Sequence, residues 1–135
     1  MRGIDSNILI YALNKDLPEH PPCKELLEKI VKGEEPISIP AIVFMESFYA
    51  LVRAFKYEES EVKLRLSALI DSENINVLEI SVATVLLAFE IAEKFKTGGR
   101  DSLIAASLIE NNIFEIYSHD AVFDNIAQLK RIDII

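Results

Sequence analysis

Four acidic residues lie singly in apolar stretches at widely separated points of the chain: Asp5, Glu46, Asp101 and Asp120. Asp5 follows Gly-Ile, Glu46 follows Ile-Val-Phe-Met, and Asp101 precedes Leu-Ile-Ala-Ala after one serine. A carboxylate beside a hydrophobic core destabilises the fold unless an opposite charge compensates it. We therefore expect the four to meet in one pocket and share a cation.

Oxygen ligands without histidine or cysteine suit the hard octahedral ions Mg²⁺ and Mn²⁺ better than zinc. Two carboxylates about 5 Å apart repel each other by roughly 3 kcal/mol at an effective dielectric near 20, so a cation is needed between them. Such an ion lowers the pKa of a bound water and offsets charge on a leaving oxygen. The chemistry that these residues indicate is metal-assisted hydrolysis of a phosphodiester.

Helical patterns alternate with short apolar runs along the chain, which predicts an α/β fold with a mostly parallel sheet. The expected helices span residues 6–13, 22–32, 41–56, 58–71, 82–96, 102–111 and about 122–129. The expected strands span residues 3–4, 37–39, 75–80, 113–117 and 132–135.

The predicted elements place the acidic residues near one edge of the sheet. Asp5 and Asp120 fall just beyond predicted strands, Asp101 starts a helix, and Glu46 lies about two turns into another. Ligands of open α/β sheets bind beyond the carboxyl ends of the strands. All four carboxylates could therefore converge there.

The chain length of 135 residues suits one domain, residues 1–135. Asp5 interrupts the region where a signal peptide needs an apolar run, and no segment has the roughly 18 apolar residues of a membrane span. The lone Cys23 forms no internal disulfide, which is compatible with a reducing compartment. We expect a cytoplasmic protein without a membrane segment.

The net charge argues against a polyanionic substrate. Fourteen Lys and Arg against 22 Asp and Glu give a formal charge of −8. A bound divalent cation would offset part of this charge. A basic rim could offset more, formed by Arg53, Lys56, Lys94, Lys96 and Arg100.

Each acidic residue also has a structural interpretation. Asp5 and Asp101 could cap helices, and Asp120 could be a turn residue. Glu46 could pair with Arg53 or Lys56 on its own helix, or reach solvent.

Four ordered motifs resemble the PIN-domain ribonucleases. They are Ile4-Asp5-Ser6-Asn7-Ile8-Leu9, Glu46 on a helix entered through Pro40, Arg100-Asp101-Ser102-Leu103-Ile104-Ala105-Ala106, and Ser118-His119-Asp120. Their order, their spacing and the small chain look most like the VapC-type toxins of type II toxin–antitoxin pairs.

The resemblance implies a three-layer α/β/α fold with a central five-stranded parallel sheet, Mg²⁺ or Mn²⁺ as cofactor, RNA as substrate and an antitoxin protein as partner. By the same resemblance Asp5 and Asp101 are the principal metal ligands, and Glu46 and Asp120 complete the catalytic site. Asp124 is a rival to Asp120. Asn7 and Ser118 match polar positions of the family, whereas His119 matches none.

A second interpretation remains open, namely a non-catalytic acidic α/β module that docks a basic protein partner. Both interpretations allow self-association, because the helices containing residues 42–55 and 82–95 offer more hydrophobic surface than one small sheet can cover. A homodimer is therefore expected.

Overall fold

Five short parallel strands form the centre of the computed structural model, which describes residues 1–135. They are β1 (Arg2–Ile4), β2 (Ile37–Pro40), β3 (Ile75–Leu78), β4 (Glu115–Tyr117) and β5 (Lys130–Ile132). The strand order is β3-β2-β1-β4-β5, and every neighbouring pair is parallel. The predicted five-stranded parallel sheet is confirmed.

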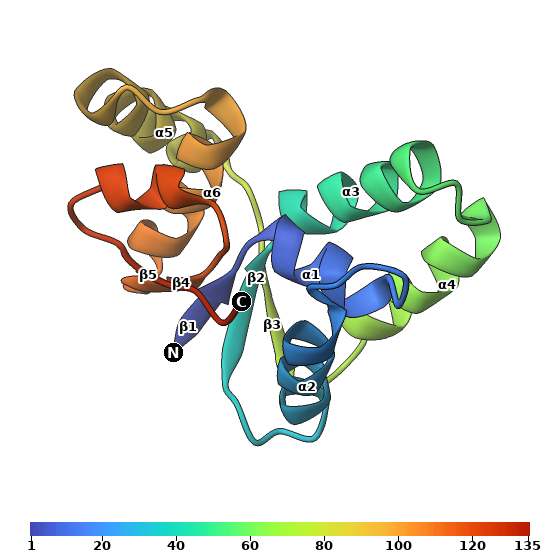
Figure 1. Ribbon diagram of the computed structural model, residues 1–135. Helices are drawn as coiled ribbons and strands as arrows, with labels where there is room; N and C mark the ends of the chain where they lie inside the picture. Colours follow the sequence, from blue (N-terminus) through green and yellow to red (C-terminus); the bar gives the residue numbers. More distant parts are fainter.

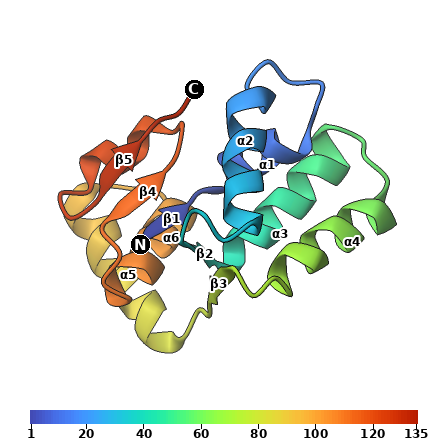
Figure 2. The ribbon, with the colours of Figure 1, turned by 90° about the horizontal axis from the view of Figure 1, so that it is seen from below.

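Helices cover both faces of this sheet. Helices α1 (Ser6–Leu13), α2 (His20–Val31), α3 (Ala41–Tyr49) and α4 (Glu59–Ile70) lie on one side, and α5 (Val82–Phe95) and α6 (Gly99–Glu110) lie on the other (Figures 1 and 2). The predicted three-layer α/β/α arrangement is therefore confirmed. None of the helices combines the length and apolarity that a membrane-crossing segment requires.

The order in which successive strands are added to the sheet reverses at β1. The chain first adds β2 and β3 on one side of β1, and α5 and α6 then lead it back to β4 on the other side. Such a reversal separates the connections that leave neighbouring strands, and ligands bind at this point in open α/β sheets. Asp5 follows β1 and Asp120 follows β4, so both lie at the reversal.

Close packing between β1 and α6 depends on Gly3. A Cβ atom at this position would lie 2.4 Å from Leu108 Cδ2 and 2.6 Å from Leu108 Cδ1. Leu108 is fully buried, as are Ile37 and Ile39 on β2. Strand β2 is buried at every position, which fits its largely apolar sequence.

The helix predicted over residues 41–56 is divided in the structure. Helix α3 ends at Tyr49 and continues as a π-helix, η1 (Ala50–Ala54), in which the Phe55 amide donates to the Ala50 carbonyl at 3.1 Å. Lys56 then adopts a left-handed conformation, with φ of 62°. A π-turn keeps the chain helical, so the apolar pattern alone did not reveal it.

Other boundaries differ from the prediction by a few residues. Helix α6 begins at Gly99 instead of residue 102, because Gly98 serves as its N-cap and Gly99 enters the helix. Strand β5 ends at Ile132, where a strand over 132–135 was expected. The predicted last helix is a short 3₁₀ segment, η2 (Ala121–Asn125).

Gly3→Ala should destabilise the fold by about 1–3 kcal/mol, the usual cost of overpacking a core. Chemical denaturation followed by circular dichroism would measure this loss. Gly99→Ala is the matched control, because a Cβ atom there meets nothing within 4 Å. Equal stability of the two variants would show that the contact between β1 and α6 tolerates a methyl group.

Candidate active site

A pocket of about 440 Å³ collects all four sequence-predicted acidic residues. Residues from the ends of β1 and β4, from α3 and from the start of α6 surround it. Its lining residues are Asp5, Ser6, Asn7, Ile10, Glu46, Ala50, Gly98, Gly99, Arg100, Asp101 and Asp120. The fold thus brings together carboxylates that are far apart in the sequence.

Asp5 is the most buried of the four, with 4% of its surface exposed. It is the N-cap of α1, and its Oδ1 accepts a hydrogen bond of 2.7 Å from the Ser6 amide. Its Oδ2 accepts a hydrogen bond of 2.8 Å from the Ser118 hydroxyl. The capping interpretation of Asp5 is therefore correct, and the same side chain also lines the pocket.

Ser118 connects the two strand ends that carry acidic residues. Its hydroxyl donates to Asp5, and its Oγ accepts a hydrogen bond of 3.0 Å from the Asp120 amide. Asp120 in turn accepts a hydrogen bond of 3.0 Å at Oδ1 from the Val122 amide, which caps η2. Ser118 thereby fixes the backbone of Asp120 relative to Asp5.

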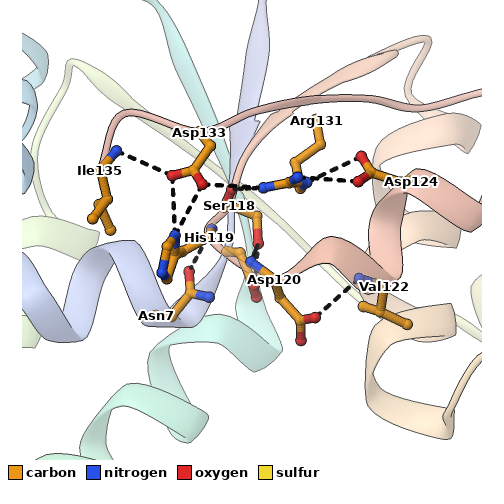
Figure 3. Close-up of polar contacts among 10 residues, drawn as sticks. Asn7, Ser118, His119, Asp120, Val122, Asp124, Arg131, Asp133 and Ile135 are labelled. Atoms are coloured by element: carbon orange, nitrogen blue, oxygen red, sulfur yellow. Dashed lines mark hydrogen bonds and ion pairs between the residues drawn. The ribbon is translucent and has the colours of Figure 1, made fainter.

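Asp124, the rival to Asp120, lies outside the pocket lining. Both of its oxygens accept hydrogen bonds of 3.0 Å from the Arg131 guanidinium. Figure 3 shows the Asp124 carboxylate turned toward Arg131 while the Asp120 carboxylate points to a different side. The geometry favours Asp120 as the acidic residue of this pocket.

His119 is also directed away from the pocket lining. Its Nδ1 lies 2.9 Å from Asp133 Oδ2, and Arg131 contacts the same carboxylate oxygen at 3.3 Å (Figure 3). The His119 amide donates to Asn7 Oδ1 at 3.5 Å. His119 therefore contributes to the packing of the C-terminal segment.

Glu46 reaches the pocket from α3 and pairs with Arg100. The distance from Glu46 Oε2 to Arg100 Nη1 is 3.4 Å. The alternative pairing of Glu46 with Arg53 or Lys56 is not formed, and the Arg53 guanidinium instead lies 6.0 Å from the Tyr49 ring centroid. The other oxygen, Glu46 Oε1, is buried and has no hydrogen-bond partner.

Asp101 lies in the first turn of α6, two residues after its first residue, and Gly98 is the N-cap, so the alternative interpretation of Asp101 as a helix cap does not hold. A carboxylate in the first turn is favourable, because the N-terminus of a helix carries partial positive charge. The turn before it is fixed by Ser102, whose hydroxyl lies 2.7 Å from the Thr97 hydroxyl in the interior.

Burial raises the pKa of Asp5, Glu46 and Asp101 above their ordinary values. Repulsion within the pocket adds to this effect, from Asp101 and Asp120 on Asp5, from Asp5 on Glu46, and from Asp120 on Asp101. Arg100 opposes the increase at Glu46 and Asp101. The protein alone thus leaves the negative charge of the pocket incompletely balanced.

These residues fit a hard divalent cation in their chemistry. The pocket offers carboxylate oxygens, an amide and a serine, and Glu46 Oε1 is a buried acceptor that lacks a donor. No group of three or more His, Cys, Asp or Glu side chains is already arranged to hold a metal ion. Side-chain adjustment would therefore accompany binding.

The sequence reasoning missed several pocket residues. Ser6, Ile10, Ala50, Gly98 and Gly99 line the pocket but carry no chemical signal of their own. Of the basic rim expected from the sequence, only Arg100 lines the pocket, and its position next to Asp101 was the available signal.

Comparison with known proteins gives one family and a consistent fold. The family model of the PIN domain matches residues 4–129. No curated protein sequence matches significantly.

Several solved structures share the fold. VapC20 of Mycobacterium tuberculosis, described as a toxin that cleaves the sarcin–ricin loop, is 16% identical with a TM-score of 0.77, and the match covers 92% of this chain and 93% of that one. VapBC2 of Rickettsia felis, bound to a promoter DNA fragment, is 20% identical with a TM-score of 0.73, and the match covers 98% of this chain and 97% of that one. DNA-bound VapBC of Salmonella typhimurium is 14% identical with a TM-score of 0.74, covering 100% of both chains.

Asp101→Asn should stabilise the cation-free protein near pH 7 by on the order of 1 kcal/mol, because it removes one of several crowded like charges. The pKa of Asp101 is higher in the folded than in the unfolded state. Ionisation of Asp101 therefore destabilises the fold as the pH rises through the pKa of the folded state. The stability gain of the variant should therefore be smaller near pH 4.

Urea unfolding in the presence of a chelator, repeated across this pH range, measures the difference. Asp16→Asn is the control, because it removes the same charge from an exposed position outside the pocket. A gain for Asp101→Asn that did not grow with pH would contradict the crowding of the carboxylates.

Proposed function

Since this chain belongs to the PIN domain family, we propose that it is a metal-dependent endoribonuclease and the toxin of a toxin–antitoxin pair. The observation that supports this most directly is the shared pocket of Asp5, Glu46, Asp101 and Asp120 with its unpartnered Glu46 oxygen. The resemblance inferred from the four sequence motifs is confirmed at the level of the family and the fold.

We assign the residues of the pocket the following roles. Asp5 and Asp101 would hold Mg²⁺ or Mn²⁺, and Glu46 and Asp120 would complete the negative charge around it. The cation, when bound, acidifies a water and offsets charge on the phosphate. Ser118 orients Asp5 by donating to it and accepts from the Asp120 amide, so these two acidic residues keep a fixed relation.

The geometry favours this proposal over an acidic module that docks a basic partner. A docking surface presents its charges to solvent, whereas Asp5 is buried and Glu46 is largely buried. Burying like charges without a partner is unfavourable, so a small cation suits them better than a protein surface. We further propose that residues 1–135 act as a single nuclease domain in the cytoplasm.

The proposal of an antitoxin partner is supported by a larger groove, lined by other residues than the acidic pocket. The groove has a volume of about 770 Å³ and lies between α1, α2 and α4. Apolar residues form part of its wall, and four basic residues outnumber two acidic ones around them. These charged residues are Lys15, Lys24, Lys32, Arg65, Glu28 and Glu61. On a protein of net charge −8, this basic groove suits an acidic amphipathic segment of a protein partner.

Homodimerisation is supported by an exposed apolar stripe on α5. Val82, Leu86 and Phe89 are 77%, 58% and 63% exposed, and their spacing places them on one helical face. Met45 and Tyr49 form a similar, shorter stripe on α3. Exposed apolar surface of this kind is typical of subunit interfaces.

Asp5→Asn and Asp101→Asn should each reduce Mn²⁺-dependent cleavage of an RNA oligonucleotide by at least about 100-fold, the scale of losing a group that stabilises developing charge. Both variants should remain folded by circular dichroism. They should also lose the stabilisation by Mn²⁺, which for the wild type reaches about 2.7 kcal/mol at 100 times the dissociation constant.

Asp120→Asn and Asp124→Asn form a matched pair that tests the fourth acidic residue. Only Asp120→Asn should lower cleavage, because Asp124 is bound by Arg131 outside the pocket.

Unchanged cleavage in the Asp5 and Asp101 variants would refute the nuclease assignment.

Leu86→Glu should convert the protein from a dimer to a monomer in light scattering coupled to size exclusion, because it places a charge within the apolar stripe of α5. Leu64→Glu is the matched control, since Leu64 is 72% exposed on α4, outside that stripe. A monomeric wild type, or equal effects of the two variants, would eliminate this interface.

A further inference from the structure

Arg100 is the one basic side chain that lines the acidic pocket. Its guanidinium lies 3.4 Å from Glu46 Oε2, and no other acidic residue forms an ion pair with it. The Arg100 side chain is 76% exposed, whereas that of Glu46 is 15% exposed. An exposed arginine side chain thus pairs with a largely buried carboxylate.

The ion pair satisfies only one of the two carboxylate oxygens of Glu46. Arginine can bind a carboxylate through two parallel hydrogen bonds, which satisfy both oxygens. Here Glu46 Oε1 stays buried without a partner. An ion pair with one exposed member also contributes little stability, because water competes for the guanidinium. This contact is therefore easy to replace.

A divalent cation bound near the unpartnered Oε1 of Glu46 would lie beside the guanidinium that contacts Oε2 of the same carboxylate. It carries twice the charge of a guanidinium and is bound by oxygen atoms alone. The guanidinium and the cation cannot both be close to Glu46 without repelling each other. Because Arg100 belongs to the first turn of α6, beside Asp101, its long side chain can move into solvent while its backbone stays in place.

We propose that Arg100 is a placeholder for the cation: its guanidinium pairs with Glu46 in the cation-free protein and is displaced when the cation binds. The inference rests on the proposed nuclease function and concerns the regulation of that same site. It requires no covalent step. Its consequence is that the pocket exchanges one positive partner for another instead of passing through an uncompensated state.

The test is a double-mutant cycle on Mn²⁺ binding by the full chain, measured by isothermal titration calorimetry. The four proteins are the wild type, Arg100→Gln, Glu46→Gln and the double variant. Arg100→Gln should bind Mn²⁺ about tenfold more tightly, within the usual range of coupling between two sites. In the Glu46→Gln background the same change should have little effect, because the competitor then has no carboxylate to occupy.

Two controls separate displacement from a general loss of positive charge. Arg53→Gln removes the same charge outside the pocket and should leave Mn²⁺ affinity unchanged. Arg100→Lys retains the charge and should bind Mn²⁺ with an affinity close to that of the wild type. Thermal unfolding provides a second readout: Mn²⁺ should raise the melting temperature of Arg100→Gln by more than it raises that of the wild type.

Unchanged or weaker Mn²⁺ binding by Arg100→Gln would overturn the proposal. An equal gain in the presence and absence of Glu46 would also overturn it, because the effect would then be long-range repulsion. Both results leave the nuclease assignment intact if Asp5→Asn and Asp101→Asn still lose cation binding. Absence of Mn²⁺ binding to the wild type would instead refute the proposed function and this inference together.

Discussion

Crowding of like charges at the carboxyl edge of the sheet is the constraint on which the site depends. Asp5, Glu46, Asp101 and Asp120 line one pocket, and burial is the main reason that the pKa of the first three is raised. The chain offsets part of this cost locally, through the helix cap of Asp5, the hydroxyl of Ser118 and the guanidinium of Arg100. The remaining imbalance is the basis of the proposal that the pocket binds a cation.

The fold tolerates this crowding because each acidic residue belongs to a separately stabilised element. Asp5 follows a central strand that packs closely against α6 through Gly3 and Leu108. Asp101 is placed by a turn that Thr97 and Ser102 fix inside the protein. Core packing of this kind keeps the carboxylates near each other even though their mutual repulsion opposes the arrangement.

The protein has two surfaces of opposite charge, and we propose a different function for each. The carboxylate pocket lies at the reversal of strand order, whereas the groove between α1, α2 and α4 has more basic than acidic residues around it. A partner held in that groove would lie on α1, the helix that Asp5 caps. The contact with a partner and the active site therefore share one structural element.

The sequence by itself determined the α/β class, the five parallel strands, the approximate helices and the four acidic residues. These features follow from local periodicity and from carboxylates placed in apolar surroundings, and both are readable along the chain. The ends of the helices were predicted less accurately than the helices themselves. The start of α6 at Gly99 and the π-helix after Tyr49 do not interrupt the apolar pattern, so the pattern did not mark them.

Only the tertiary structure decided the partners of the acidic residues. Glu46 pairs with Arg100 and not with a basic residue of its own helix, and Arg131 rather than the pocket binds Asp124. Ser118 joins Asp5 to the backbone of Asp120. The Glu46–Arg100 and Asp5–Ser118 contacts join segments that lie far apart in the sequence. Their distances depend on how helices pack on the sheet, which no local pattern encodes.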